Sequence, residues 1–355
     1  MNCAAVIVNY FTRELVESLV DSLYIENTVS SITIIDNSRD LSSFSLNKYR
    51  EKPVKLIVNP ENRGYGAAAN QGIECAQERW VLIANPDVRF KPGCIESLLG
   101  AADSYQASIV GPRFYLDEDK LFRIPPASGS CLWFDYAQNA AQSFPLDADL
   151  LSFYWTIRHD RFWSACEPFP EPFLSGAALV IDKERVKTKE ENVFDENFFL
   201  YFEDTDLSIR TIEQGEKILC VPQAEAIHFY DQSPSPGFSK AALMNQAKNA
   251  FMAKYYGDLA IPSIDASYPS PHIEDLGILK EPVSFQSRSQ APYPEKKYFE
   301  IGMSSIFVPF VQAFFDQKTF TIPSHVWNRL RAGTYFGRVR GSLTGVSEVC
   351  KWKKL

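Results

Sequence analysis

Short, almost wholly apolar runs alternate with longer amphipathic stretches over the first 110 residues. The apolar runs predict buried strands at residues 4–8, 31–35, 55–58 and 80–84. Between them, helices are predicted from Thr12, a residue type that caps helix N-termini, and over residues 67–77 after Gly66. Strands this apolar, separated by helices, imply an α/β fold with a mostly parallel central sheet covered on both faces.

The pattern weakens in the middle of the chain, where residues 115–172 are rich in proline and aromatic residues. It then predicts strands at 173–181 and 217–221, and helices near Asp204 and over 239–256. Residues 268–294 are rich in proline and serine, as linkers are. The expected organisation is therefore an α/β domain over residues 1–260, a linker over 261–295 and a C-terminal segment over 296–355.

Charge separates this C-terminal part from the rest of the 355-residue chain. The net charge is −8, which argues against a general nucleic-acid binder. Residues 286–355 hold 11 Lys and Arg against 4 Asp and Glu, a net of +7, so the preceding 285 residues carry −15. The apolar run 306–315 lies among these cations and is too short to span a bilayer. Apolar surface beside cations predicts peripheral membrane contact; a packed subdomain or a dimer interface are the open alternatives.

The seven cysteines are scattered and form no C-x-x-C pair, which fits a reducing compartment. No signal peptide and no apolar stretch of membrane-spanning length is evident. These features predict a cytoplasmic protein, with the inner face of the plasma membrane as the place of any peripheral contact.

Polar residues follow the predicted strands, at the edge where ligands bind in such sheets. The segments are Val8-Asn9-Tyr10, Ile35-Asp36-Asn37-Ser38, Asn62-Arg63-Gly64 with Asn70, Asn85-Pro86-Asp87, and Glu203-Asp204-Thr205-Asp206 followed by His228. Together, over about residues 4–257, they resemble family 2 glycosyltransferases of the GT-A fold, most closely the rhamnosyltransferase-like branch. Each motif alone is weak, but five in this order are specific.

The resemblance implies a nucleotide diphosphate sugar donor, with dTDP-L-rhamnose expected first and a UDP-sugar next. It implies a glycan or lipid-linked oligosaccharide acceptor in bacterial-type surface polysaccharide synthesis. Asp36 is expected to accept a hydrogen bond from the ring N–H of the base; a turn-forming Asp-Asn pair is the alternative. The other residues expected to line the nucleotide-sugar site are Asn9, Tyr10, Asn37, Asn62, Arg63, Gly64, Asn70, Asn85 and Asp87.

A divalent cation neutralises the charge that grows on a departing diphosphate, and hard cations prefer oxygen ligands. The family's Asp-x-Asp motif reads Asn85-Pro86-Asp87 here, so Asp87 is its only carboxylate. The resemblance implies that Asp87 and His228 hold Mn²⁺ or Mg²⁺. A hydrogen-bonded structural histidine is the alternative for His228.

An inverting transfer needs one base near the acceptor hydroxyl, and we expect that base to be Asp204. Glu203 is the alternative base, or contacts the acceptor, while Asp206 is expected to be structural. Helix capping by these carboxylates is compatible with catalysis.

Two other function classes fit parts of the sequence. Residues 64–69 match the dinucleotide pattern G-x-G-x-x-A, which suggests a nucleotide-dependent oxidoreductase. The glycines follow the third predicted strand rather than the first, and Pro60 intervenes, so we disfavour that class. A non-catalytic glycan-binding relative is disfavoured because Asp87, Asp204 and His228 are all present.

Overall fold

The computed structural model describes residues 1–187, 191–230, 232, 239–257, 273–287, 295–342, 345–346 and 349–355. The chain forms two compact units. Unit 1 comprises residues 1–113, 127–130 and 165–259, and unit 2 comprises residues 114–126, 131–164 and 260–355. Each unit has its own hydrophobic core.

The sheet of unit 1 begins with four parallel strands. They are β1 (Cys3–Asn9), β2 (Val29–Asp36), β3 (Val54–Val58) and β4 (Trp80–Ala84), in the order β3-β2-β1-β4. The sheet continues with β9 (Ala178–Asp182) and β6 (Ile109–Tyr115), where β9 is antiparallel to both neighbours. The mostly parallel α/β sheet expected from the apolar runs is confirmed, and the carboxyl ends of β1, β2 and β4 lie along one edge.

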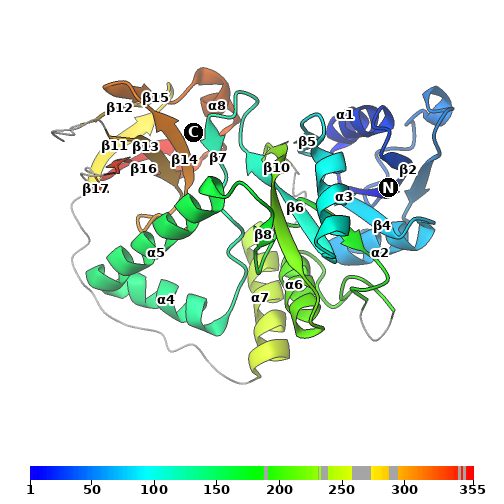
Figure 1. Cartoon of the computed structure of the whole chain (residues 1–355). Helices are drawn as coiled ribbons and strands as arrows, with labels where there is room; N and C mark the ends of the chain where they lie inside the picture. The colour runs from blue at the N-terminus through cyan, green and yellow to red at the C-terminus, as the bar shows by residue number, and fades with distance from the viewer. Residues whose placement is uncertain are drawn as a thin grey trace. The chain divides into compact units, whose positions relative to one another are not determined.

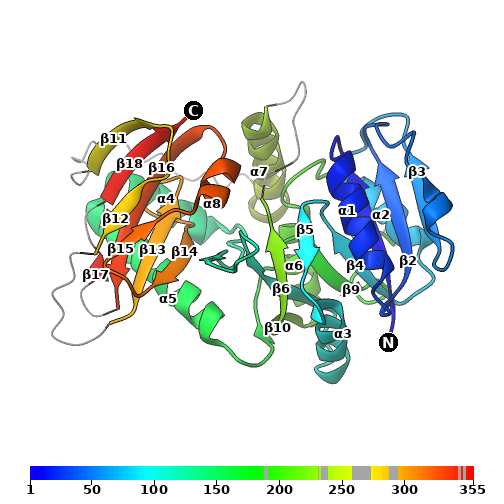
Figure 2. The same ribbon diagram turned by 90° about the horizontal axis from the view of Figure 1, so that it is seen from above.

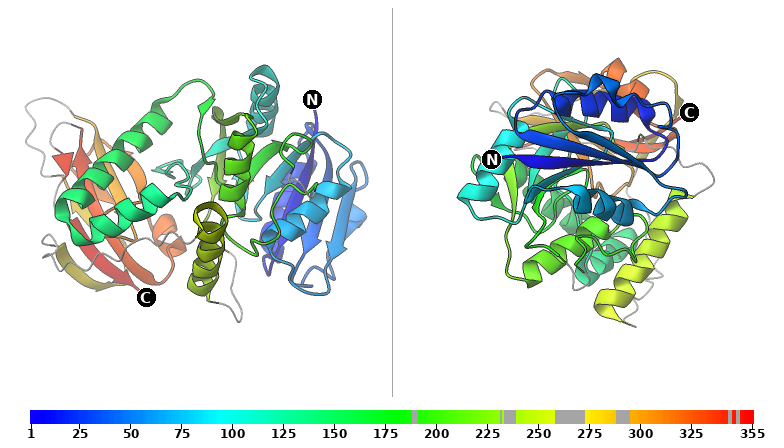
Figure 3. Two further views of the ribbon diagram at one scale, coloured as in Figure 1. Left: turned by 90° about the horizontal axis from the view of Figure 1, so that it is seen from below. Right: turned by 90° about the vertical axis from the view of Figure 1, so that its right-hand side faces the viewer.

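Helices cover both faces of this sheet. Figure 3, in its right-hand view, shows α1 (Arg13–Tyr24) on one face and α2 (Tyr65–Cys75) on the other. Helix α2 packs closely because its inner face is built from alanine and glycine; a Cβ on Gly72 would lie 2.4 Å from a Val6 methyl group. The remaining elements of unit 1 are η1 (Leu46–Lys48), β5 (Val88–Phe90), α3 (Cys94–Ser104), β8 (Phe169–Pro170), α6 (Glu203–Glu213), β10 (Ile218–His228) and α7 (Lys240–Tyr256).

Unit 2 contains a row of paired strands, most of them labelled side by side in Figure 2. Its order is β11 (Ile273–Leu279), β18 (Val349–Lys354), β16 (Gly333–Gly341), β13 (Lys297–Gly302), β14 (Val311–Phe315) and β7 (Phe122–Arg123). The pairs are antiparallel except β11 with β18. Short elements complete it: β12 (Ser284–Gln286), β15 (Thr319–Thr321), α8 (Ser324–Arg329) and β17 (Gly345–Val346). Its core is largely aromatic, with Phe122, Phe299 and Trp352 fully buried.

Two helices of unit 2 occupy the stretch in which the sequence showed only weak periodicity. They are α4 (Leu132–Ser143) and α5 (Pro145–Ser164), which pack together as the helical hairpin in Figure 1. Helix α5 buries Leu151 and Trp155 on one side while Leu150 and Phe153 are exposed on another. Because apolar residues occur on both sides of the helix, the 3.6-residue alternation of apolar and polar positions is blurred.

The range 261–295, expected as a linker, contains β11 and β12 in its described part. Residues 261–272 and 288–294 of that range lie outside the described residues. The apolar run 306–315 is mostly core, since Phe307, Val308 and Phe310 pack with α4 and α5. Among the described residues, no helix is long and apolar enough to cross a membrane.

Candidate active site

The carboxyl ends of β1 and β2 are joined by a dense polar network. Asn9 and Asp36 are in register on the paired strands, and both are fully buried. The Asn9 side-chain amide donates to Asp36 Oδ1 at 2.9 Å and to Asp40 Oδ1 at 2.6 Å. Its carbonyl oxygen accepts from the backbone and hydroxyl of Thr12, which fixes the start of α1. Asn9 therefore orients this edge of the sheet from within.

The Asp36 carboxylate accepts five hydrogen bonds at 2.9–3.0 Å, from Asn9 Nδ2, both the amide and hydroxyl of Ser38, and the amides of Arg39 and Leu41. Burial opposes ionisation of Asp36, but these hydrogen bonds outweigh it and lower the pKa of the carboxyl. A carboxylate offers about four lone-pair positions. Four of the five bonds go to Oδ1, whereas Oδ2 accepts only the Leu41 amide and keeps acceptor capacity. The bonds to the Ser38 and Arg39 amides are those of a turn-forming aspartate, and the half-buried Asp40 is a second carboxylate at the same edge.

The turn before α2 approaches this edge. Asn62 accepts from the Gly64 amide at 3.0 Å, and Asn37 donates to the Gly64 carbonyl at 3.0 Å. Gly64 has φ of +85°, and a Cβ there would lie 2.4 Å from the Phe199 carbonyl, so only glycine fits. Arg63 is exposed and lies 3.9 Å from a carboxylate oxygen of Glu196. Tyr10 is half-buried and packs edge-on against Phe11.

Asn70 fixes the loop that leads to α6. Its amide nitrogen donates to the Phe194 carbonyl at 2.8 Å, and its oxygen accepts from the Phe194 amide at 2.9 Å. The contact spans 124 residues of sequence, and Asn70 is almost completely buried. Asn70 therefore positions the loop of residues 194–202 against α2.

Asp87 and His228, which the sequence placed far apart, lie together. The antiparallel pairing of β5 with β10 sets His228 opposite Val88, next to Asp87. His228 Nε2 lies 3.5 Å from Asp87 Oδ1, and both residues are 7% exposed. Burial opposes the ionisation of Asp87, yet His228 and the Gln232 amide lower its pKa. Asn85 Oδ1 is also buried and has no hydrogen-bond partner among the described residues.

Glu203 and Asp204 begin α6. The two preceding residues, Tyr201 and Phe202, have φ of 73° and 68°, a left-handed conformation that is costly for bulky side chains and is often found at functional sites. Asp204 Oδ2 accepts from the Gly176 amide at 3.0 Å, and Oδ1 accepts from the Thr205 amide at 2.7 Å. Glu203 is 7% exposed, and its Oε2 has no hydrogen-bond partner among the described residues.

The two carboxyls differ in how well their charged forms are stabilised. The pKa of Glu203 is raised to about 8, mainly by burial and further by the negative charge of the neighbouring Asp204. Burial also raises the pKa of Asp204, but the amides of Gly176 and Thr205 stabilise its anion. The two backbone amides therefore favour the charged form of Asp204, whereas Glu203 Oε2 has no hydrogen-bond partner among the described residues.

Tyr65 and Gly176 belong to the same cluster, and the sequence analysis did not single out either. The Tyr65 hydroxyl donates to the Gly176 carbonyl at 3.3 Å, while the Gly176 amide donates to Asp204. Burial is the main cause that raises the pKa of the Tyr65 hydroxyl. The negative charges of Glu203, Asp204 and Asp87 raise it further. The tyrosine thus lies within electrostatic reach of both predicted groups, the base and the metal ligand. Its place inside the Gly64-Tyr65-Gly66 motif was the only available signal.

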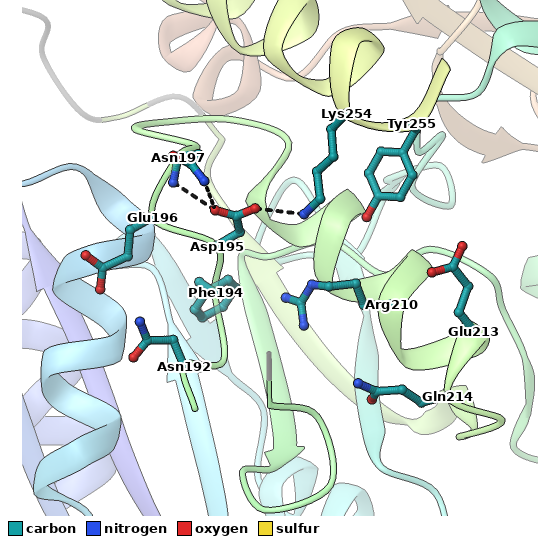
Figure 4. A pocket seen from close by; sticks show the side chains of 10 residues that line it. All are labelled: Asn192, Phe194, Asp195, Glu196, Asn197, Arg210, Glu213, Gln214, Lys254 and Tyr255. Carbon is teal, nitrogen blue, oxygen red and sulfur yellow. Dashed lines mark hydrogen bonds and ion pairs between the residues drawn. The ribbon is translucent and has the colours of Figure 1, made fainter. Parts of the chain in front are cut away.

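A cavity of about 770 Å³ opens beside α6 and α7, drawn in Figure 4. Lys254 lies on it and pairs with Asp195 at 2.7 Å. Asp206 is fully buried and accepts from Arg210 at 2.8 Å, Tyr255 at 2.7 Å and Lys254. Asp206 therefore ties α7 to α6. No predicted catalytic or metal-binding residue lines this cavity.

In unit 2, Asp117, Asp119 and His325 form a second group that can hold a cation. Their ligand atoms lie within 4.8 Å of one another. Both oxygens of Asp117 already accept backbone amides, from Leu121 at 3.1 Å and Phe122 at 2.7 Å, and Asp119 is 74% exposed. The sequence analysis did not identify this group.

Comparison with known proteins gives a consistent picture. The model of the family described as glycosyl transferase family 2 matches residues 6–164. N-acetylglucosaminyl-diphospho-decaprenol L-rhamnosyltransferase of Mycobacterium tuberculosis is 30% identical over 231 residues, which cover 58% of this chain and 68% of that protein. The succinoglycan biosynthesis protein ExoO of Rhizobium meliloti is 30% identical over 82 residues, covering 23% of this chain and 24% of that protein.

Among solved structures, GalNAc-T7 with UDP, GalNAc and Mn²⁺ aligns with a TM-score of 0.50 at 14% identity. The match covers 73% of this chain but only 48% of that chain, so it supports the fold alone. The fold is the GT-A fold expected from the motifs.

Proposed function

The chain belongs to glycosyltransferase family 2, and on that basis we propose that it transfers a sugar from a nucleotide diphosphate to a hydroxyl of a glycan acceptor, with inversion at the anomeric carbon. The observation that carries this proposal is one cluster. Asp204, held by Gly176, and the Asp87–His228 pair lie around the same Tyr65 side chain. A base and a candidate cation site in one cluster are what such a transfer requires.

Asp204 is the proposed base. Its carboxylate is fixed by two backbone amides at the N-terminus of α6, where the helix dipole also favours negative charge. A fixed carboxylate can accept the proton of an acceptor hydroxyl at hydrogen-bond distance. Glu203, whose pKa is raised to about 8, holds its proton at neutral pH and is suited to donate a hydrogen bond to the acceptor.

Asp87 and His228 are the residues that would hold a divalent cation. They offer a carboxylate oxygen and an imidazole nitrogen that lie 3.5 Å apart, and the buried Asn85 Oδ1 two residues before Asp87 has no hydrogen-bond partner among the described residues. Oxygen and imidazole nitrogen atoms are suitable ligands for Mn²⁺ or Mg²⁺. When bound, such a cation neutralises charge on the departing diphosphate. Unit 2's Asp117 is a weaker candidate, because its oxygens are already engaged by backbone amides.

The nucleotide is proposed to lie over the edge formed by Asn9, Asp36 and the Asn62-Arg63-Gly64 turn. Asp36 holds the turn, and Asp40, half-buried at the same edge, offers a carboxylate to the ring N–H of the base. Arg63 is exposed and can approach the diphosphate. The close contact of Gly64 with the Phe199 carbonyl fixes the turn against the loop that precedes Asp204, the proposed catalytic base.

The donor and acceptor are proposed from the relatives. The mycobacterial relative is named for L-rhamnose transfer to a decaprenol-linked N-acetylglucosamine. We propose dTDP-L-rhamnose as the first donor to test, a UDP-sugar as the second, and a polyprenyl-diphosphate-linked saccharide at the cytoplasmic membrane face as the acceptor.

The test is donor hydrolysis, followed by transfer, across a panel of nucleotide sugars with Mn²⁺ or Mg²⁺. We expect turnover of one deoxythymidine or uridine diphosphate sugar, loss of turnover in Asp204→Asn, and a product of inverted anomeric configuration. Turnover of no donor, or a product that retains configuration, contradicts the proposal. Stabilisation by NAD instead of a nucleotide sugar would favour the oxidoreductase class.

A further inference from the structure

The helical hairpin of unit 2 exposes a row of large apolar side chains. On α5 they follow one another at helical spacing, and two aromatic residues of α4 join them. We call this set the hairpin face; its exposed fractions run from 43% to 70%, and its members are Trp133, Tyr136, Leu146, Leu150, Phe153, Tyr154 and Ile157. Figure 3, in its left-hand view, shows the two helices in front of the strands of unit 2. Soluble surfaces rarely gather so many large apolar groups without a partner.

The opposite side of the same helices is already used. Phe134, Leu151 and Trp155 are buried against Phe307 and Phe310. The hairpin face is therefore not needed for the core of unit 2. A helix that is apolar on both sides is normally covered on both sides. Within unit 2, no described residue covers the hairpin face.

We propose that the hairpin face docks on the surface of a lipid bilayer. The inference rests on the proposed function, because an enzyme with a polyprenyl-linked acceptor has to reach the membrane surface. From Leu146 to Ile157 the row runs for about 16 Å at the helical rise of about 1.5 Å per residue. A row of that length lying flat places Leu150, Phe153 and Ile157 at the level of the acyl chains, as interfacial helices do.

The charges of the hairpin fit a lipid partner better than a second copy of the chain. Helix α4 has one charged residue, Asp135, which is 5% exposed. On α5 the exposed charges are Asp149, which lies beside Leu150 within the row, and Asp160 and Arg161, which follow the end of the row at Ile157. A specific dimer needs charged or hydrogen-bonding groups that fix its register, whereas a bilayer needs none. The exposed Trp133, Tyr136 and Tyr154 are of the residue types enriched at membrane–water interfaces.

The C-terminal segment, where the sequence placed the membrane contact, offers less surface for it. Its apolar run is mostly buried. Arg338 and Arg340 are buried around Glu300, at 2.7 Å each, and Lys351 pairs with Asp275 at 2.7 Å. Membrane contact through the hairpin face is driven by apolar burial, so it should persist at high salt, whereas contact through exposed cations should be lost.

The test is flotation of the full chain with phosphatidylcholine vesicles, with and without phosphatidylglycerol, at low and high salt. The variant combines Leu150→Gln, Phe153→Gln and Ile157→Gln. The control combines Ile25→Gln, Ile212→Gln and Ile278→Gln, whose side chains are similarly exposed, at 77%, 46% and 59%, but lie outside the hairpin. We expect the control to float like wild type and the hairpin variant to bind at least about tenfold more weakly.

Several outcomes would overturn the proposal. They are failure of the wild type to float, equal flotation of the hairpin variant, and binding abolished by salt. A wild-type dimer that the hairpin variant converts to a monomer, measured by light scattering, would assign the face to a second copy. Donor hydrolysis in solution separates this inference from the proposed function. The hairpin variant should retain donor hydrolysis. If the wild type hydrolyses no donor, but floats and loses flotation in the hairpin variant, the docking face is supported while the proposed function fails.

Discussion

Replacing Asp204 by asparagine tests the proposed base with little change in shape. Both carboxylate oxygens accept a backbone amide, from Gly176 at 3.0 Å and from Thr205 at 2.7 Å. Asparagine has one oxygen, so its NH₂ group must face one of these N–H donors. The lost hydrogen bond and the unfavourable contact should cost about 1–3 kcal/mol. Removal of a buried charge offsets part of that cost, so the variant is expected to fold.

The effect on chemistry should be far larger than the effect on stability. An amide cannot accept the proton of the acceptor hydroxyl, and loss of a general base typically lowers turnover by roughly 10²–10⁴-fold. Because burial raises the pKa of Asp204, the wild-type rate should rise with pH above the range of an ordinary aspartate, as the base ionises. The small residual rate of the variant should lack that rise.

The assay is initial-rate transfer to a water-soluble acceptor across a pH series, with calorimetry for donor binding in the presence of metal. Donor affinity should stay near that of the wild type. Gly176→Ala is the positioning control, since its Cβ would lie 3.1 Å from Asp204 Cβ and displace the carboxylate without removing it. We expect a smaller loss of turnover there, of about tenfold.

Two results would refute the assignment of the base. If Asp204→Asn keeps near-normal turnover while Glu203→Gln is inactive, the base is Glu203. If both variants remain active, neither residue is the base, and the mechanism argued from this pair fails.

The remaining predictions concern the metal, the nucleotide and stability. Asp87→Ala should abolish activation by Mn²⁺ or Mg²⁺, and His228→Ala should weaken it at least about tenfold in a metal titration; full wild-type activity in excess chelator would contradict both. Asp36→Ala should lower the melting temperature, because five donors lose their acceptor. Asp40→Asn should leave the melting temperature unchanged but weaken nucleotide binding about tenfold, measured by calorimetry. The pKa of Glu203 is raised from the ordinary 4.5 to about 8 in the folded state. Between these two pH values the folded state keeps a proton that the unfolded state has lost, so the free energy of unfolding falls as the pH rises. Glu203→Gln should therefore melt at least about 3 °C above wild type at pH 8 and close to it at pH 5, and an equal melting temperature at pH 8 would refute this.

Periodicity and motif order predicted the four parallel strands and the fold class of unit 1. The four apolar runs became β1 to β4 within one or two residues at each end. Strands β1 and β4 and most of β2 are buried, so they have few polar positions to blur the pattern, whereas the edge strand β3 is only partly buried. The order of polar residues at the strand ends likewise predicted the family and its fold. The hairpin α4–α5 was missed for the opposite reason, since residues apolar on two sides leave no single amphipathic stripe.

What the sequence could not provide is distance through space. It suggested Asp87 and His228 as partners only by resemblance, and the pairing of β5 with β10 brings them within 3.5 Å. It predicted Asp36 as the acceptor for the ring N–H of the base, but it could not show the five donors that surround this carboxylate in the fold.

The different surroundings of Glu203 and Asp204 are also decided only by tertiary structure. The two residues are neighbours of the same chemical type, so the sequence ranked them only by family resemblance. Gly176, at a distance of 28 residues, donates its amide to one of them and not to the other, and burial acts on both. A carboxyl's proton affinity depends on the donors and the solvent around it, and only the folded chain determines those.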